Sequence, residues 1–384
     1  MDFELTKQQK LARHVAREFA QQELEPHAQE LDETMAFPRD AVQKMAGLGF
    51  MGISIPKEYG GAGLDTVSYT LIIEELARAC ASTAIIVAVH NSVCAYPIHL
   101  LGTEEQKQKY LIPLARGQKL GAFALTEPNA GSDPASMETT AELRGKHYIL
   151  NGTKIFITSG SSSDIVMVMA STDRAKRGRG ITCFIVEKGL KGFSVGKKED
   201  KLGIRGSDTC ELIFENCAVP AENVLGSPGE GLTSALTTLD TGRIGVGAQA
   251  LGVAQAALDE SVRYSKERKQ FGKPLADFQA IQWMIADMAT EIAAARFLVH
   301  RAAWLKDQGR PFSTEGSMAK LYASEVAMRA ALKAVQIHGG YGCMKDYKVE
   351  RFLRDAKVIE IYEGTSEIQR LIIARNVIGK GRNT

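Results

Sequence analysis

A single acidic residue in the stretch IYEGTSEIQRL, residues 361–371, has the type and the position of a candidate base. Glu363 lies between an aromatic residue and a glycine on a short connector. Ser366 and Gln369 follow with the S-x-x-Q spacing of a capping box, which predicts that a helix begins there. A carboxylate in this place can accept a proton, although most loop glutamates only contact water. The rest of the sequence has to separate these two interpretations.

Five further stretches combine small, polar and aromatic residues in patterns that are typical of ligand binding. Small residues and hydroxyl groups let a backbone approach a polar ring or a phosphate, and basic residues beside an aromatic one suit phosphate and adenine. Each stretch also has a structural interpretation: a domain-joining loop, a strand with one buried aromatic, an exposed ion pair, a solvated helix end or a helix C-cap. The stretches are FALTEPNAGSDPAS at 123–136, FITSG at 156–160, TLDTGRIGVG at 238–247, KERKQFGKPLADFQ at 266–279 and QIHGGYG at 336–342.

Composition excludes several other kinds of site. The net charge of +2, with both signs interspersed, predicts no nucleic-acid partner. Six cysteines without a C-x-x-C spacing predict reduced, mostly buried thiols, and seven histidines without an H-E-x-x-H spacing predict no metal site. No stretch has the spacing of a dinucleotide-binding loop, a P-loop or a G-x-S-x-G nucleophile elbow.

The N-terminal segment and the apolar runs predict a protein without a membrane span. Residues 1–19 lack the apolar core of a signal peptide, and Thr6 with Gln9 indicates a capped amphipathic helix. The longest apolar runs, such as AIIVAV at 84–89, are too short to cross a bilayer. We therefore expect a soluble protein in a reducing compartment, which is the cytoplasm for a bacterial-type chain.

Three regions must position these stretches. Residues 1–120 show helical periodicity, interrupted by glycines and prolines. Residues 121–225 contain short runs rich in Val, Ile and Phe, with Asn151-Gly152 as a hairpin signal, and no helical pattern separates them. Residues 226–384 return to long helical patterns with small residues on the stripes. The expected fold is a multidomain α+β protein: a helical domain, a middle antiparallel barrel or sandwich, and a C-terminal four-helix bundle.

Taken in chain order, the motifs resemble those of the acyl-CoA dehydrogenase family, most of all its short-chain, butyryl-CoA type. The resemblance covers essentially the whole chain with family-like spacing. The stretches that carry it are LTEPNAGSD, LNGTKIFIT, KKEDKLGIRGS, FENCAVPAENVLG, LDTGRIGVGAQALG, RKQFGKPL, QIHGGYG, RDAK and IYEGTSEIQR.

The resemblance implies an FAD cofactor held between the β domain, the C-terminal bundle and a neighbouring subunit. It also implies a homotetramer, built as a dimer of dimers, that passes electrons to an electron-transfer flavoprotein. The residues implied to bind the cofactor are Phe123, Leu125, Thr126, Ser132, Phe156, Ile157, Thr158, Arg268, Phe271, Gln279, Gln336, Gly339, Gly340, Thr365, Ser366 and Glu367. Of these, Arg268, Gln279 and residues 336–340 are implied to reach the FAD of a partner subunit.

For the reaction, the resemblance implies that Glu363 removes the α-proton of an acyl-CoA while flavin N5 accepts the β-hydride, giving a trans-2-enoyl-CoA. The thioester oxygen would bind the Glu363 backbone N–H and the FAD ribityl 2′-hydroxyl. Exclusion of water by the acyl chain would raise the pKa of the base. The residues implied to contact substrate are Ser132, Asp240, Arg243, Gln249, Ile359 and Gly364.

The substrate and the direction stay open at this level. Gln249 matches the short-chain type, whereas Ile359 stands where some short-chain members carry threonine, and IHGGYGCMKDY is similar to branched-short-chain members. Butyryl-CoA is the first choice, and branched C4–C5 acyl-CoAs or reversal as an enoyl- or acryloyl-CoA reductase are alternatives. An acyl-CoA oxidase is a further rival, although such oxidases usually carry an additional C-terminal domain. A non-catalytic helical scaffold is the rival from another class.

Overall fold

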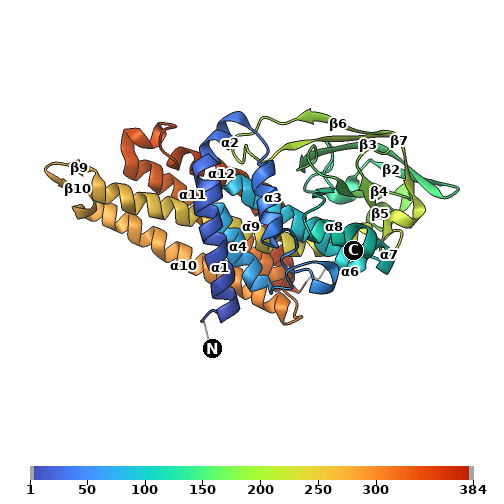
Figure 1. Ribbon diagram of the computed structural model, residues 1–384, viewed down its shortest axis with the longest axis horizontal. Helices are drawn as coiled ribbons and strands as arrows, with labels where there is room; N and C mark the ends of the chain where they lie inside the picture. The colour runs from blue at the N-terminus through green and yellow to red at the C-terminus, as the bar shows by residue number, and fades with distance from the viewer. Residues whose placement is uncertain (1–3, 380–384) are drawn as a thin grey trace.

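A set of short helices forms the N-terminal part of the protein, and the computed structural model describes residues 4–379 (Figure 1). Helix α1 begins after Thr6, whose side chain forms the predicted capping box with Gln9. Helix α4 begins after Asp65, whose carboxylate accepts the Ser68 N–H. The helices are α1 Lys7–Phe19, α2 Ala28–Thr34, α3 Arg39–Gly47, α4 Thr66–Ala79, α5 Ala81–Val89, α6 Tyr96–Leu101, α7 Glu104–Gln106 and α8 Ile112–Ala115.

Three widened π-helical turns interrupt these helices, and each ends two residues before a proline. A proline lacks the N–H that an α-helix needs, and its ring clashes with the carbonyl one turn earlier. A wider turn moves that carbonyl away and lets the chain stay helical through the proline. The turns and their prolines are Ala20–Leu24 with Pro26, His90–Ala95 with Pro97, and Lys107–Leu111 with Pro113.

The π-helical turn His90–Ala95 connects α5 and α6, so the three segments form one continuous helix, Ala81–Leu101. Within residues 4–379 it is the one helix long and apolar enough to cross a membrane, and 78% of its most apolar window is buried inside the fold. A core helix of a folded domain passes the same test of length and composition. The apolar run at 84–89 is thus only part of a longer apolar helix.

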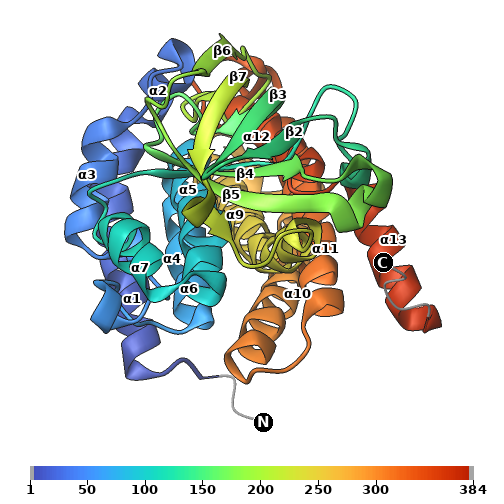
Figure 2. The same ribbon diagram turned by 90° about the vertical axis from the view of Figure 1, so that its right-hand side faces the viewer.

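The middle region forms one sheet, in the order β6-β7-β3-β2-β4-β5-β8, with β1 beside β4 (Figure 2). Most neighbouring strands are antiparallel, as expected, but β1 runs parallel to β4, and β2 meets β4 in parallel at one position. The strands are β1 Gly121–Ala124, β2 Thr140–Arg144, β3 His147–Thr158, β4 Ile165–Ser171, β5 Ile181–Glu187, β6 Phe193–Lys198, β7 Thr209–Pro220 and β8 Val224–Leu225.

The hairpin predicted at Asn151-Gly152 is wrong, because β3 continues through both residues. The turn between β2 and β3 instead uses Gly145, which has a φ of 61°. Gly152 lies at a register shift against β7, and a Cβ there would stand 2.4 Å from Thr139 Oγ1. The asparagine-glycine pair therefore marks a close approach inside a bulged strand rather than a turn.

Within residues 226–379, the α-helices α9 to α13 form the C-terminal part, with a small β9–β10 hairpin at the far end of the long axis from the sheet (Figure 1). The long helical patterns predicted within residues 226–384 are confirmed as helices, of which α9 to α11 are the longest. Helix α9 approaches α4 closely at Gly252, where a Cβ would lie 2.4 Å from Glu74 O. The elements are α9 Gly231–Glu267, β9 Lys269–Gln270, β10 Lys273–Pro274, α10 Gln279–Asp307, α11 Ser313–His338, α12 Val349–Ile361 and α13 Ser366–Ile378.

The six cysteines are free thiols. Five of them are buried, as the sequence predicts, and Cys343 is exposed.

Candidate active site

Glu363 lies in the turn between α12 and α13. Its φ is 51°, and Gly364 follows with a φ of 98°, so two consecutive residues are left-handed. A non-glycine residue in this conformation is strained, and such strain is concentrated at functional sites. The predicted capping pair is wrong by one residue: Thr365 is the N-cap of α13, and its side chain accepts the Ile368 N–H at 3.4 Å.

The carboxylate of Glu363 occupies a space that glycine leaves on α9. A Cβ on Gly242 would lie 2.2 Å from Glu363 Oε2 and 3.3 Å from Val93 Cγ1. The residue as a whole is half-buried, but Oε2 is enclosed and has no hydrogen-bond partner within residues 4–379. Burial raises the pKa of Glu363 to about 7, although Lys320 and Arg243 oppose this. An enclosed carboxylate with a pKa near neutrality is suited to accept a proton.

Two cations and a phenol lie around this carboxylate. Lys320 on α11 is fully buried, and burial lowers its pKa to about 8 against the opposing charge of Glu363. Arg243 on α9 is buried and paired with Asp240, whose Oδ1 also accepts from Ser313 Oγ at 3.0 Å. The Asp240–Arg243 pair is thus buried, not a solvated ion pair. Tyr69 on α4 is buried, and its hydroxyl fills the space beside Gly245, where a Cβ would lie 2.2 Å from it.

Gln249 and Ile359 are both fully buried near this turn. The Gln249 amide donates to Ala81 O at 2.8 Å, and its oxygen accepts from the Tyr362 hydroxyl. Both ends of the amide are therefore engaged, which fixes its orientation. Ile359 belongs to the apolar core shared by the N- and C-terminal helices.

One group of predicted cofactor residues gathers at the sheet. Thr126 O accepts from Ile155 N at 2.9 Å, and Leu125 O accepts from Lys154 Nζ at 3.1 Å. Phe156 follows at a bulge in β3, with a φ of 58° and 61% of its side chain exposed. A strained, exposed aromatic residue indicates a surface that receives a flat ligand. In the same group Phe123 and Thr158 are half-buried, Ile157 is buried in the sheet core, and Ser132 is exposed.

A second group lies on the exposed end of the C-terminal helices. Arg268 lies 5.5 Å from the centre of the Tyr341 ring, and Phe271 in the hairpin is 94% exposed. Gln279, Gln336, Gly339 and Gly340 are exposed as well. Because the hairpin and the sheet lie at opposite ends of the molecule, the chain does not bring the two groups together (Figure 1).

The first turn of α13 fits a polar ligand such as FAD. Ser366 Oγ and Gln369 Oε1 are buried without a hydrogen-bond partner within residues 4–379, and Thr241 Oγ1 on α9 shares this property. Buried polar atoms of this kind usually have a partner, so a bound group that supplies acceptors and donors accounts for them. Free N–H groups at the start of a 13-residue helix add to the attraction for an anionic cofactor. Thr365 and Glu367 flank these atoms, half-buried and exposed respectively.

Sequence reasoning missed several residues that surround Glu363. Lys320 and Tyr69 lie far from Glu363 in sequence, so nothing in their spacing relates them to a base. Tyr362 directly precedes Glu363, but the hydrogen bond of its hydroxyl to Gln249 becomes visible only in the structure. Gly242 is part of GRIGVG, and its role becomes visible only once the Glu363 side chain is placed against it. A lysine in the small-residue stripe SMAKLYAS of α11 is the one signal that points to a buried cation.

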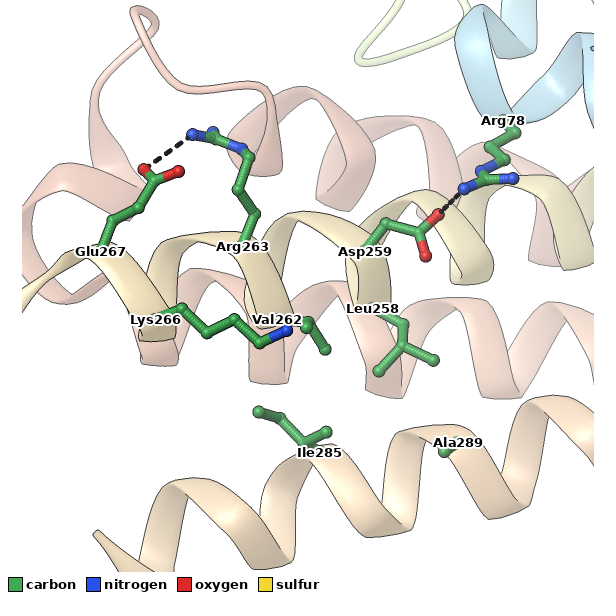
Figure 3. Close-up of a pocket in the computed structure, with 9 residues that line it drawn as sticks. All are labelled: Arg78, Leu258, Asp259, Val262, Arg263, Lys266, Glu267, Ile285 and Ala289. Atoms are coloured by element: carbon green, nitrogen blue, oxygen red, sulfur yellow. Dashed lines mark hydrogen bonds and ion pairs between the residues drawn. The ribbon is translucent and has the colours of Figure 1, made fainter. Parts of the chain in front are cut away.

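A surface hollow of about 560 Å³ lies elsewhere, between α9 and α10 (Figure 3). Four of the five charged side chains that line it pair with each other: Arg78 with Asp259 at 2.6 Å, and Arg263 with Glu267 at 3.1 Å. None of the predicted site residues lines it. We therefore centre the candidate site on Glu363 rather than on this hollow.

The three parts of the chain match three family models. They are the acyl-CoA dehydrogenase N-terminal domain over residues 6–118, the middle domain over 122–217 and the C-terminal domain over 229–378. The chain therefore belongs to the acyl-CoA dehydrogenase family, and it is an oxidoreductase.

Individual relatives narrow this assignment. A short-chain specific acyl-CoA dehydrogenase of Clostridium acetobutylicum is 54% identical over 98% of this chain and 100% of its own. An acryloyl-CoA reductase (NADH) of Anaerotignum propionicum is 52% identical over 98% of this chain and 96% of its own. The structure of butyryl-CoA dehydrogenase from Megasphaera elsdenii matches with a TM-score of 0.97 at 48% identity, covering 98% of this chain and 100% of that one.

Proposed function

We propose that the protein catalyses the α,β-dehydrogenation of a short-chain acyl-CoA, with butyryl-CoA as first choice and Glu363 as the base. The observation that carries the proposal is the enclosed Glu363 carboxylate, whose Oε2 has no hydrogen-bond partner among the described residues. It is held on a left-handed turn, and its pKa is raised to about 7. A saturated thioester has a weakly acidic α-proton, so its removal needs a base of this strength in a site without water.

Glu363 performs two tasks in this proposal. Its carboxylate accepts the α-proton, and its backbone N–H binds the thioester oxygen, where negative charge develops. The turn is held by Gln369, whose Nε2 donates to Gly364 O at 3.0 Å, and by Lys320. Arg243 and Asp240 lie beside the same turn and would contact the substrate.

FAD is the cofactor, and when bound it supplies the acceptor for the β-hydride at N5. The residues that would hold it in one chain are Thr126 with its neighbours in 123–132, Phe156 to Thr158, and the first turn of α13. The backbone of Ile157 would take part, because its side chain is buried in the sheet core.

We further propose that the second group, around Arg268, reaches the FAD of a partner subunit in a homotetramer. The C-terminal helices expose large apolar side chains that an isolated chain leaves uncovered. They are Trp283, Trp304, Val377 and Ile378 on the helices, and Phe271 in the β9–β10 hairpin adds to them. In the proposed assembly, the parts 1–120, 121–225 and 226–384 act as three domains. The enzyme would work in the cytoplasm and pass electrons to an electron-transfer flavoprotein.

A chain-length series tests the substrate. An acyl pocket gains about 0.8 kcal/mol per buried methylene until it is full, after which further carbons clash or stay wet. If Gln249 and Ile359 close the pocket, kcat/KM is highest near C4 and falls sharply by C8, and Ile359→Ala moves the optimum towards C6. The series includes isobutyryl- and isovaleryl-CoA and uses an artificial electron acceptor. A wild-type optimum at C8 or beyond contradicts the short-chain assignment but leaves the dehydrogenase assignment intact.

Reversal of the reaction is the second candidate, because an acryloyl-CoA reductase is nearly as similar to this chain as the short-chain dehydrogenase. Both directions use the same carboxyl group, as a base in oxidation and as an acid in reduction, and the same flavin, so the test compares rates. Butyryl-CoA oxidation with an artificial acceptor is measured against reduction of acryloyl-CoA and crotonyl-CoA. A much faster reduction, retained with the natural donor, favours the reductase. A colourless protein that takes up no FAD would instead support the scaffold.

A further inference from the structure

Lys320 is a buried cation whose ammonium group binds the turn that carries Glu363. It lies in the middle of α11 and is fully buried. Its Nζ donates to Glu360 O at 3.0 Å and to Gly364 O at 2.8 Å. One of these carbonyls belongs to the last turn of α12, and the other follows Glu363 directly. The two acceptors therefore bracket the base.

These contacts give the turn its geometry. The last carbonyls of a helix have no partner inside the helix, and Lys320 supplies one for α12. The same ammonium fixes the peptide after Glu363, where two consecutive residues are left-handed. Gln369 Nε2 donates to the same Gly364 oxygen from α13. The strained turn is thus held by donors from two helices.

A neutral donor could make these hydrogen bonds, so the charge of Lys320 needs its own explanation. Burying an ammonium is unfavourable unless an opposite charge lies close by. The titratable or charged groups that interact with Glu363 are Tyr69 on α4, Arg243 on α9, Lys320 on α11 and Tyr362, which directly follows α12. Lys320 also interacts with Glu360 and Glu367. Arg243 is paired with Asp240. Lys320, by contrast, forms no ion pair with a carboxylate among the described residues. Its charge is therefore the one that acts on Glu363 without being offset by a paired carboxylate.

We propose that Lys320 is a positioning residue of the base: it holds the turn that aims the Glu363 carboxylate, and its charge favours the ionised form of that carboxylate. This inference rests on the proposed function of Glu363. Without the ammonium, only the charge of Arg243 would counteract the effect of burial on Glu363. The pKa of Glu363 would therefore rise, and the carboxyl group would stay protonated to higher pH. Removal of the Lys320 hydrogen bonds alone would misalign the Glu363 carboxylate. Removal of the Lys320 charge would also change the pH dependence of the reaction, which the loss of a purely structural lysine would not do.

The test compares two substitutions at this position with a matched control. Lys320→Gln keeps a hydrogen-bond donor and removes the charge, and Lys320→Met removes both. The control is Lys306→Gln on α10, because Lys306 is half-buried, burial lowers its pKa as well, and it contacts Thr66 and the Tyr96 ring instead of the Glu363 turn. All variants are studied as the FAD-loaded full chain.

The first readout does not depend on turnover. Infrared difference spectra between each protein and its Glu363→Gln counterpart report the protonation of Glu363 across a pH series. Lys320→Gln moves this titration upward by about one pH unit, and Lys306→Gln leaves it in place. The titration gives an answer about Lys320 even if no acyl-CoA is turned over, so the failure of this inference and of the proposed function are distinguishable.

The second readout is the pH profile of kcat/KM with butyryl-CoA. The acid limb of Lys320→Gln shifts upward with the infrared titration, while Lys320→Met also loses kcat at pH values where Glu363 is ionised. If both Lys320 variants titrate like wild type, Lys320 is only structural and the proposal is wrong. If Lys320→Met does not fold, Lys320→Gln still tests whether the charge of Lys320 influences the titration of Glu363.

Discussion

Two buried lysines in this molecule have opposite relations to a nearby glutamate. In the sheet, Lys154 donates to Glu127 Oε1 at 2.7 Å, and both side chains are almost completely buried. Glu127 also accepts the N–H groups of Glu138 and Thr139. In the helical part, Lys320 donates to main-chain carbonyls, and the Oε2 of Glu363 has no hydrogen-bond partner within the described residues 4–379.

The difference decides which glutamate can do chemistry. Burial favours the protonated form of Glu127, but the ion pair and its hydrogen bonds outweigh burial and lower its pKa. At Glu363 burial prevails and the pKa rises to about 7. A carboxylate whose lone pairs are all used stabilises the fold, whereas one that keeps a free oxygen can take a proton. The first pair stabilises the loop that contains Thr126, and the second site leaves its carboxylate available.

The largest expected effect comes from replacing the open glutamate. Glu363→Gln is nearly isosteric and cannot accept a proton, so turnover falls by roughly 10² to 10⁴-fold or more. FAD content and substrate binding stay close to wild type, which absorbance and ligand titration measure. A variant with near wild-type turnover would remove Glu363 from the role of base.

Replacing the closed glutamate is expected to act on stability. Glu127→Gln leaves Lys154 buried without a counter-charge, which destabilises the fold by about 3–5 kcal/mol. Denaturant unfolding measures this change. The control is Glu142→Gln, which removes an exposed partner of Arg144 and should leave the unfolding midpoint unchanged. Equal unfolding midpoints for the two variants would contradict a stabilising role for the buried Glu127–Lys154 pair.

The two glutamates should also give opposite pH dependences of stability. Unfolded Glu363 ionises near 4.5 and folded Glu363 near 7, so raising the pH through this window favours the unfolded chain by up to about 3 kcal/mol. Glu363→Gln is therefore more stable than wild type above pH 7, and the gain disappears below pH 4.5. Glu127, whose pKa is lowered in the folded protein, has the opposite effect. Its contribution to the stability of the folded protein is lost as the pH falls through its folded pKa. Unfolding curves at several pH values test both signs.

A smaller effect is expected from filling the space beside the open carboxylate. The Cβ of Gly242→Ala meets the mobile end of the Glu363 side chain, so the carboxylate moves while the helix persists. A displacement of about 1 Å can reduce turnover roughly 10²-fold. Gly247→Ala on the same helix, where the nearest atom is Val299 Cγ2 at 3.1 Å, is the control for alanine in α9. Similar activity of both variants argues against the assigned position of Glu363.

The sequence predicted what depends on local pattern. Helical periodicity located α9 to α11, and the Thr6–Gln9 pair located the start of α1, because caps and stripes involve residues close in the chain. The family resemblance singled out Glu363. The hairpin at Asn151-Gly152 failed because a contact with Thr139, not the local dipeptide, determines why glycine is needed there.

The surroundings of Glu363 could not be predicted in the same way. Gly242, Lys320 and Tyr69 meet the base from three helices that are far apart in sequence. Their roles follow from packing geometry: a space left by a glycine, a lysine that reaches two carbonyls and a phenol beside α9. Single-residue patterns contain none of this information.

The apolar helix Ala81–Leu101 has a consequence for biosynthesis. The helices that pack against it include α9, whose synthesis is complete only at Glu267. At a ribosomal rate of about 5–20 residues per second, roughly 10–30 seconds separate the synthesis of this helix from that of its cover. During this interval the nascent chain displays a segment with the length and apolarity of a membrane anchor. In this interval α4, which is synthesised earlier and packs against α5, is available to cover part of the segment before α9 leaves the ribosome.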